Sequence, residues 1–258
     1  MATDKILDET QEIMVQDLHL VVAETVWPPY QTGKFIASKI MPQYKAAIKN
    51  KIVLDVGTGS GLIALKAGKL GAKKVFATDL NAKAVLAAQE NWERNSLPPD
   101  KLDTFVSDAL ANLPDELEGK INLIISNPPV QPMLEINSNG KERDSAYDWN
   151  EAEKGGRAVL DSVIIDGLRF LFPGDMIITS TSTRHGWNQT QELLNSLTRE
   201  GKIQSWKEIH RETHQLAPFY DKYIPLWLEM QAKDGDTRIW KNGKGWSHDF
   251  IVLELINC

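Results

Sequence analysis

Short apolar runs alternate along this chain with longer segments whose apolar side chains recur at helical spacing. The runs, each typical of a buried strand, lie at 53–56, 75–79, 104–108, 121–126, 176–180, 203–209 and 250–256. Helical spacing is found over 60–68, 81–92, 158–170 and 189–198. Such alternation is typical of a parallel, doubly wound sheet. We therefore predict an α/β fold with a Rossmann-like sheet of seven strands, the last of which is antiparallel because no helix precedes it.

Three segments depart from this alternation. Residues 1–49 combine an amphipathic stretch with Val26-Trp-Pro-Pro-Tyr30 and predict an N-terminal helical cap, whereas residues 131–156 are polar. Residues 211–248 are rich in aromatic side chains and predict an inserted flap near the C-terminus. Because no repeat or low-complexity linker separates these segments from the core at 50–210 and the last strand at 249–256, we expect one domain over 1–258. Ligands of open α/β sheets bind beyond the carboxyl ends of the strands, where the first two segments are expected to form a roof.

Composition narrows the class of protein further. The 258 residues are 42% hydrophobic and 25% charged, which is ordinary for a globular protein. A net charge of −6 and a pI near 5.5 give no overall basic field, so a nucleic-acid partner is disfavoured. The single cysteine, Cys258, excludes a disulfide framework and fits a reducing cytoplasm. The polar N-terminus is unlike a signal peptide, and no apolar run is long enough to span a membrane.

The first predicted strand runs into a glycine-rich loop, Val53-Leu-Asp-Val-Gly-Thr-Gly-Ser-Gly61. Glycines between a strand and a helix N-terminus expose backbone to a ligand. The third glycine follows the second after two residues, where dinucleotide-binding loops need three, and no Gly-Lys-Ser/Thr follows. The spacing therefore argues against NAD and against a phosphate-binding P-loop. With Asp55 two residues before Gly57, the loop resembles the first motif of class I S-adenosylmethionine (SAM) dependent methyltransferases.

Acids close each of the first three predicted strands, at Asp55, Asp79 and Asp108. Asp79 lies where a Rossmann-type fold places a carboxylate on ribose hydroxyls. The resemblance implies that Asp55 faces the amine of SAM and that Asp108 lies near its adenine. The cofactor residues that it implies are Asp55, Gly57, Thr58, Gly59, Gly61, Asp79, Leu80, Asp108, Ala109 and Asn127. The alternative is structural: a tight turn without a ligand, and acids that cap helices.

Ser126-Asn-Pro-Pro129, directly after the fourth strand, resembles the N/D-P-P-Y/F motif of amino-methylating enzymes, including protein-glutamine and nucleobase-amine methyltransferases. The Asn127 amide oxygen and the Pro128 carbonyl are acceptors that can hold both hydrogens of a planar nitrogen, while Pro129 restricts the backbone. We therefore predict Asn127, Pro128 and Pro129 as catalytic residues. The alternative is that these residues only end a strand.

The motif departs from the family at its fourth position, Val130, where an aromatic side chain usually stacks on a planar target. This departure makes a smaller or non-planar amine more plausible than a flat amide or base. Farther along, Gly155-Gly-Arg-Ala-Val-Leu-Asp161 resembles the segment after the motif in glutamine-methylating relatives. The resemblance covers about residues 50–183 and excludes both flanks.

Several further residues are candidates for the site. Trp27, Tyr30 and Val130 are predicted to contact the substrate, and Trp27 lies in a stretch that resembles one near the cofactor in protein-lysine methyltransferases. His210 and His214 are four residues apart but lack a third ligand, so no metal is predicted. His185 either faces the site or begins a helix. The aromatic side chains of 211–248 form either the packing of a flap or a cage for an amine.

The sequence thus predicts a methyltransferase that uses SAM, releases S-adenosylhomocysteine and acts most readily on nitrogen. The expected substrate is an amine or amide of a small molecule or of a protein side chain. Two alternatives stay open, namely a nucleobase amine in RNA or DNA and a SAM-binding protein without catalysis. Oxygen and carbon acceptors also stay open, and the sequence carries no signal for the oligomeric state.

Overall fold

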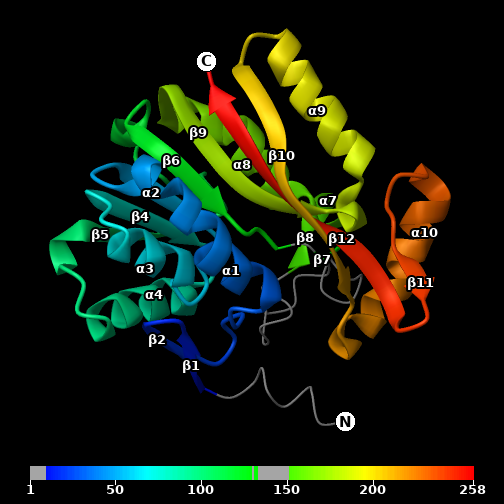
Figure 1. The fold of residues 1–258 in the computed structure, drawn as a ribbon, viewed down its shortest axis with the longest axis horizontal. Coiled ribbons are helices and arrows are strands. Elements are labelled where there is room, and N and C mark those ends of the chain that lie inside the picture. The colour runs from blue at the N-terminus through cyan, green and yellow to red at the C-terminus, as the bar shows by residue number, and fades with distance from the viewer. Residues whose placement is uncertain (1–9, 130, 133–150) are drawn as a thin grey trace.

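An eight-stranded sheet with helices on both faces forms the centre of the molecule (Figure 1). The computed structural model describes residues 10–129, 131–132 and 151–258. The strands are β3 (Ile52–Val56), β4 (Lys74–Asp79), β5 (Leu102–Val106), β6 (Ile121–Ser126), β9 (Leu171–Ser182), β10 (Ile203–Gln215), β11 (Trp240–Asn242) and β12 (Gly245–Asn257). Their order is β10-β12-β9-β6-β3-β4-β5, with the short β11 paired to β12. Apart from β11, the seven remaining strands are those predicted from the sequence.

The parallel core is wound in both directions from β3. β3 pairs in parallel with β4 on one side and with β6 on the other, and β6 pairs in parallel with β9. β12 is antiparallel to both β9 and β10, which confirms the expected return of the last strand. The change of direction between β4 and β6 leaves a crevice at the carboxyl end of β3, the point at which open α/β sheets bind ligands.

Helices cover both faces because adjacent residues of each strand point to opposite sides. The helices are α1 (Gln31–Phe35), α2 (Lys45–Ile48), α3 (Leu62–Lys69), α4 (Ala82–Arg94), α7 (Glu153–Gly156), α8 (Ala158–Ile165), α9 (Trp187–Arg199) and α10 (Ile224–Asp234). Val53 faces a core shared with α2, α3 and the end of α4, whereas Leu54 faces one shared with α8 and α9. Both cores are fully enclosed, and no helix among the described residues is long and apolar enough to cross a membrane.

The N-terminal segment, predicted as a helical cap over 1–49, has helices over 31–48 but also a hairpin that was not predicted. The hairpin consists of β1 (Gln11–Val15) and β2 (Leu18–Val22), joined at Gln16 and Asp17. Two asparagines of α4 bind the backbone of β2: the Asn91 amide accepts from Val21 N and donates to Val21 O, both at 2.8 Å. Asn95 does the same at His19. These bonds fix the hairpin on α4 and thereby direct the chain after β2 across the carboxyl ends of β3 and β4.

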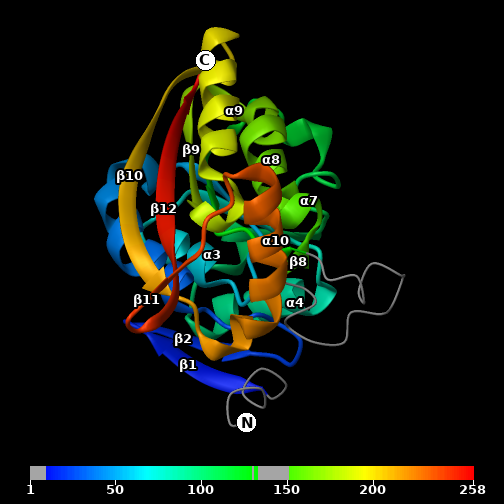
Figure 2. The same ribbon diagram turned by 90° about the vertical axis from the view of Figure 1, so that its right-hand side faces the viewer.

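The flap near the C-terminus is shorter than the sequence indicated. β10 continues to Gln215 and β12 begins at Gly245, so the insertion spans 216–244 rather than 211–248. β10 is an edge strand with mostly exposed side chains, which hides its extent from a search for apolar residues. Seen from the side, the flap with α10 stands beside β12 (Figure 2). The flap has a small apolar core of its own, formed by Tyr220, Tyr223, Trp227 and Ile239.

Candidate active site

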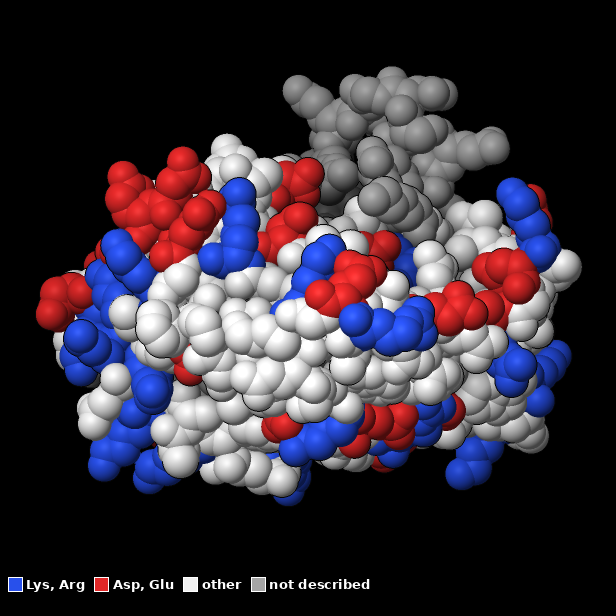
Figure 3. Space-filling model, turned by 90° about the horizontal axis from the view of Figure 1, so that it is seen from above, with Lys and Arg blue, Asp and Glu red and all other residues white. Residues whose placement is uncertain are grey.

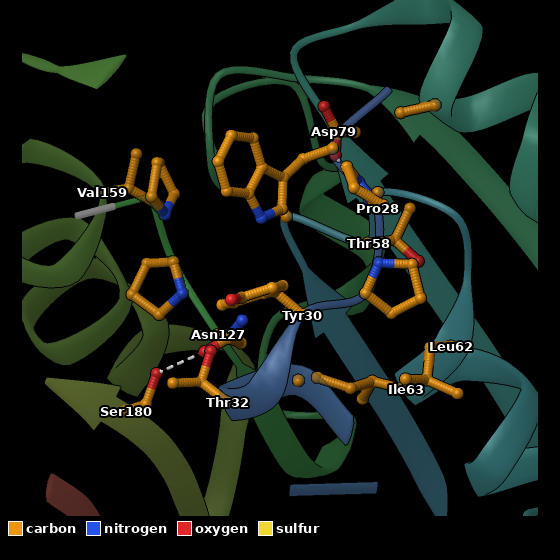
Figure 4. Close-up of a pocket in the computed structure, with 18 of the residues that line it drawn as sticks. Pro28, Tyr30, Thr32, Thr58, Leu62, Ile63, Asp79, Asn127, Val159 and Ser180 are labelled. Atoms are coloured by element: carbon orange, nitrogen blue, oxygen red, sulfur yellow. Dashed lines mark hydrogen bonds between the residues drawn. The ribbon is translucent and has the colours of Figure 1, made fainter. Parts of the chain in front are cut away.

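A pocket of about 290 Å³ opens at the carboxyl ends of β3, β4, β5 and β6. Its wall contains most of the residues predicted from the sequence, namely Trp27, Tyr30, Gly57, Thr58, Gly59, Asp79, Leu80, Asp108, Ala109, Asn127, Pro128 and Pro129. Figure 4 shows Asp79 and Thr58 on one side of the pocket, Ser180 and Val159 on the other, and Tyr30 and Asn127 between them. Val130 lies outside the described residues. Strand ends distant in sequence therefore meet around one space.

The glycine loop forms the floor of the pocket. Gly57, Gly59 and Gly61 all have positive φ angles, of 75°, 54° and 85°. A Cβ added at Gly57 would meet no atom within 4 Å, so the backbone there faces open space. A Cβ at Gly61 would lie 2.9 Å from Ala88 Cα. Gly61 is outside the pocket wall, and its role is to let the loop pack against α4 rather than to contact a ligand.

The Asp79 carboxylate is held at the end of β4 by backbone donors. Its Oδ2 accepts from Gly59 N at 2.9 Å, and its Oδ1 accepts from Asn81 N at 2.9 Å. Burial raises the pKa of Asp79, and the backbone donors at Asn81, Gly59 and Leu80 oppose that shift. A carboxylate has about four acceptor positions, so capacity remains for hydroxyl donors of a ligand. The next strand, β5, leads to Asp108, which is exposed in the wall of the same pocket.

Asp55 lies below the pocket rather than in its wall. It is fully buried, and its Oδ2 accepts from Thr58 Oγ1 at 2.7 Å and from Ala64 N at 3.0 Å. These bonds tie β3 to the loop and to the first turn of α3. In this arrangement Asp55 shapes the loop, and the direct contact with the cofactor amine expected from the sequence stays a prediction. Burial raises the pKa of Asp55 to about 7.

The raised pKa of Asp55 predicts a pH dependence of stability. Between about pH 4 and pH 7 the folded protein keeps a proton that the unfolded chain, with an ordinary value of 3.8, has lost. The free energy of unfolding therefore falls as the pH rises through this window, by about 4 kcal/mol at most. Urea unfolding at several pH values gives the change in the free energy of unfolding per pH unit. This change should be smaller in Asp55→Asn than in the wild type. Asp115→Asn, at an exposed turn, is the control and should keep the pH dependence of the wild type. An unchanged pH dependence in Asp55→Asn would refute the raised pKa of Asp55.

The Asn-Pro-Pro turn borders the pocket opposite Asp79. Asn127 Oδ1 accepts a hydrogen bond from Ser180 Oγ at 2.8 Å (Figure 4). Ser180 is buried on β9, next to β6 in the sheet, so the bond fixes the amide plane from the neighbouring strand. The amide oxygen keeps a second acceptor position. Sequence reasoning missed Ser180 because a serine within an apolar strand carries no signal of its own.

Loss of the Ser180 hydroxyl is expected to reduce turnover without unfolding the protein. Removing one hydrogen bond that fixes Asn127 should lower kcat by roughly fivefold, the equivalent of about 1 kcal/mol. The affinity for SAM should stay unchanged, since Ser180 lies on the side away from Asp79. The measurement is steady-state kinetics of Ser180→Ala beside Ser196→Ala, which removes a half-buried serine on α9 that is outside the pocket wall. A fall in SAM affinity with unchanged kcat would contradict this role.

The N-terminal segment and the flap meet over the pocket through one aromatic side chain. The Phe219 ring lies edge-on to Trp27 and to Tyr30, with ring centroids 5.7 and 5.5 Å apart. Trp27 and Tyr30 thus line the pocket and join the flap, so the roof is built by the N-terminal segment and the C-terminal flap. The residues 133–150 of the polar segment, which were also expected to form a roof, lie outside the described part of the chain.

The far end of the pocket, beyond Asn127, was not predicted as a site. It is lined by Ser182, Arg184, His214, Tyr220 and His248. His248 Nδ1 is 2.8 Å from Ser182 Oγ, and burial, reinforced by Arg184, lowers the pKa of His248 well below its usual value. His214 stacks on Phe250 at 5.2 Å. This end is therefore polar and holds neutral histidine at physiological pH.

The remaining candidates do not form a metal site. His210 and His214 lie on β10, a strand, and not on a helix as zinc binding at that spacing requires. Within the described residues, no group of three or more His, Cys, Asp or Glu side chains is placed to hold a metal ion. His185 is buried in the turn after β9, with its Nδ1 3.2 Å from Thr181 Oγ1.

Arg157 and Asp161, from the segment that resembles glutamine-methylating relatives, form a buried ion pair of 2.8 Å. The Arg157 guanidinium also donates to His185 O, at 2.6 Å, and to Thr190 Oγ1, at 2.8 Å. It therefore joins the start of α8 to the turn after β9 and to α9. This segment therefore holds the turn that carries Arg184, next to the pocket.

Comparison with known proteins agrees with this geometry. The family described as ribosomal protein L11 methyltransferase (PrmA) matches residues 38–143. A putative protein N5-glutamine methyltransferase of Methanocaldococcus jannaschii is 29% identical over 185 residues, which are 72% of this chain and 86% of that protein. The L11 methyltransferase of Lactobacillus johnsonii is 36% identical over 128 residues, 46% of this chain but only 39% of that protein. The M. jannaschii tRNA m1G37 methyltransferase has the same fold, with a TM-score of 0.56 at 16% identity over 97% of this chain and 57% of that chain.

The strand order, the glycine loop and the acids at successive strand ends define a Rossmann-like methyltransferase fold. Together with the relatives, they identify the chain as a class I SAM-dependent methyltransferase, and SAM is its cofactor. The residues present fit that cofactor, because open backbone at Gly57 adjoins a half-buried carboxylate with acceptor positions to spare at Asp79.

Proposed function

We propose that this methyltransferase methylates a nitrogen atom, with Asn127 and Pro128 as the acceptors that orient it. The observation that carries the proposal is the position of the Asn-Pro-Pro turn, in the same pocket as Asp79 and with its amide plane fixed by Ser180. A putative glutamine methyltransferase and an L11 methyltransferase among the relatives support a nitrogen acceptor.

The proposed cofactor residues divide between the floor and the walls of the pocket. Asp79 accepts from the ribose hydroxyls, beside Leu80, while Asp108 and Ala109 border the adenine. Gly57, Thr58 and Gly59 lie against the methionyl part. SAM supplies an electrophilic methyl group on a sulfonium centre. Asn127 Oδ1 and the Pro128 carbonyl accept the N–H hydrogens of the acceptor, which aims its lone pair and needs no titrating base.

The charges at the acceptor end favour a neutral nitrogen. A cationic amine would need carboxylates around it, yet Arg184 and neutral His248 lie there. An amide or an uncharged amine of a small molecule or protein side chain fits better. Away from the pocket, on the described part of the side at which β12 ends, Lys and Arg are interspersed with Asp and Glu around a broad uncharged band (Figure 3). The net charge of −6 also gives no overall basic field to attract a nucleic-acid backbone.

The test combines calorimetry with transfer of labelled methyl groups. We expect SAM and S-adenosylhomocysteine to bind, and label to pass to a glutamine peptide or a small amide in preference to tRNA at physiological salt. Labelling of tRNA alone, with steep salt dependence, would replace the substrate class by nucleobase amines. Binding of SAM without transfer to any of these acceptors would favour a SAM-binding protein without catalysis.

A further inference from the structure

Arg184 is a buried cation that the proposed transfer does not use. It lies in the short turn after β9 with 3% of its surface exposed, and it lines the acceptor end of the pocket. Its Nε donates to Ser182 Oγ at 3.2 Å. Its Nη1 has no hydrogen-bond partner in the described structure. A guanidinium that lines a pocket and keeps a buried donor unused is a binding group for an anion.

No carboxylate balances this charge within the described residues. Arg157, the other buried arginine, pairs with Asp161 at 2.8 Å, whereas Arg184 forms no salt bridge. Aromatic faces hold Arg184 instead, since the rings of Tyr220 and Trp227 lie 5.1 Å from its Cζ. The flap's aromatic cage therefore encloses the protein's own cation rather than a substrate amine. Such stacking offsets only part of the cost of burying an unpaired charge.

The surroundings of Arg184 indicate the charge of the missing partner. Arg184 is the only Lys or Arg among the described residues that line the pocket. Burial keeps His248 neutral, and Ser182 is an uncharged neighbour that bonds to both. The complement of this site is a single negative charge with two oxygens, as in a carboxylate. A phosphate, with a charge of about −1.5 to −2, would leave part of its charge unbalanced.

We propose that Arg184 binds a carboxylate group of the methyl acceptor, an assignment that rests on the proposed function. The spacing of residues along β9 places Asn127 and Arg184, the residues proposed to bind the nitrogen and the carboxylate, close to each other. Ser180 holds Asn127 and Ser182 contacts Arg184, and two residues of a strand span about 7 Å. The acceptor thus carries its nitrogen and its carboxylate close together, within roughly two to three residues' length of extended chain.

The test uses acetate as the probe and follows thermal unfolding of the full chain saturated with S-adenosylhomocysteine. Acetate replaces chloride at constant ionic strength, at about 100 mM, in the wild type, Arg184→Met and Arg169→Met. Arg169 is an exposed arginine far from the pocket and serves as the matched control. Acetate should raise Tm by about 3 °C in the wild type and the control, and not in Arg184→Met. Acetamide should have no effect in any of them.

Three outcomes overturn the inference. These are an acetate shift that persists in Arg184→Met, the absence of any shift in the wild type, and a larger Arg184-dependent shift with phosphate. If Arg184→Met does not fold, Arg184→Lys replaces it and should lose more than half of the shift, because lysine lacks the planar fork; an undiminished shift overturns the inference. Trialanine with a free or an amidated C-terminus distinguishes a peptide end from a small acid as the source of the carboxylate.

Calorimetry with SAM separates this inference from the proposed function. Arg184→Met should bind SAM within about twofold of the wild type. A loss of more than about tenfold would assign Arg184 to the cofactor, which overturns the inference and leaves the methyltransferase intact. A wild-type protein that binds acetate through Arg184 but transfers no methyl group would refute the proposed function alone.

Discussion

Replacing Asn127 with alanine is expected to lower kcat by roughly 10²–10³-fold, because the acceptor nitrogen loses the group that orients it toward the methyl carbon. The Asn127 side chain is already fixed by Ser180, so little reorganisation accompanies substrate binding. The affinity for SAM should change by less than about tenfold, since Asp79 and the glycine loop remain. Single-turnover rates with saturating SAM are the measurement, because they isolate the transfer step from product release.

The control for this variant is Asn188→Ala, which removes an exposed asparagine at the start of α9. Its rate should equal that of the wild type. Asn127→Asp keeps the shape of the side chain and tests whether a neutral amide is needed. Turnover of Asn127→Ala within twofold of the wild type would remove the turn from the mechanism and leave it as the end of a strand.

The buried strands could be predicted because both of their faces are apolar. Ile121–Ser126 and Ile52–Val56 are mostly apolar runs, and the structure has strands there. The extent of the edge strand β10 is harder to predict, because its side chains are mostly exposed and are polar beyond Ile209. The hairpin at Gln11–Val22 was missed because its apolar alternation is interrupted at Gln16. This residue has a φ of 56°, a turn conformation that a glutamine in the sequence does not indicate.

The predicted site residues that line the pocket share one property: each stands at the carboxyl end of a strand or in the segment before the core. Parallel strands bring such ends together whatever the intervening sequence, so Asp79, Asp108 and Asn127 could be placed in one pocket. Arg184 could not. The sequence Thr183-Arg-His-Gly186 is typical of a turn with a solvent-exposed arginine. Arg184 is buried because Tyr220 and Trp227 of the flap pack on it.

The two ends of the pocket have opposite electrostatic character. Asp79 and Asp108 border the end proposed for the cofactor, which carries a sulfonium charge, while Arg184 borders the acceptor end. Asn127 lies between them and is uncharged. If the two proposals hold, this division would orient an acceptor with one anionic group so that its nitrogen, rather than its carboxylate, faces the methyl donor. A neutral nitrogen would then need only orientation to react, which is the role proposed for Asn127.

Asp79→Ala is expected to weaken SAM binding by about 10²-fold or more. Two hydrogen bonds from ribose hydroxyls to a carboxylate contribute about 1.5 kcal/mol or more each, and both are lost. The glycine loop also loses a support, because Asp79 Oδ2 accepts from Gly59 N and Oδ1 from Asn81 N. Asp79→Asn keeps one oxygen and should lose about tenfold. Calorimetry with SAM and with S-adenosylhomocysteine measures both variants.

The matched control is Asp103→Ala on the neighbouring strand β5. Asp103 is an exposed aspartate that pairs with Lys74 at 2.9 Å and lies outside the pocket wall. The Asp103→Ala substitution removes the same charge from the protein as Asp79→Ala does, so any general electrostatic effect on a cationic cofactor appears in both variants. The difference between them therefore isolates contact at the end of β4. Equal affinities in Asp79→Ala and Asp103→Ala would show that the ribose lies elsewhere, and the orientation of SAM proposed for this pocket would have to be abandoned.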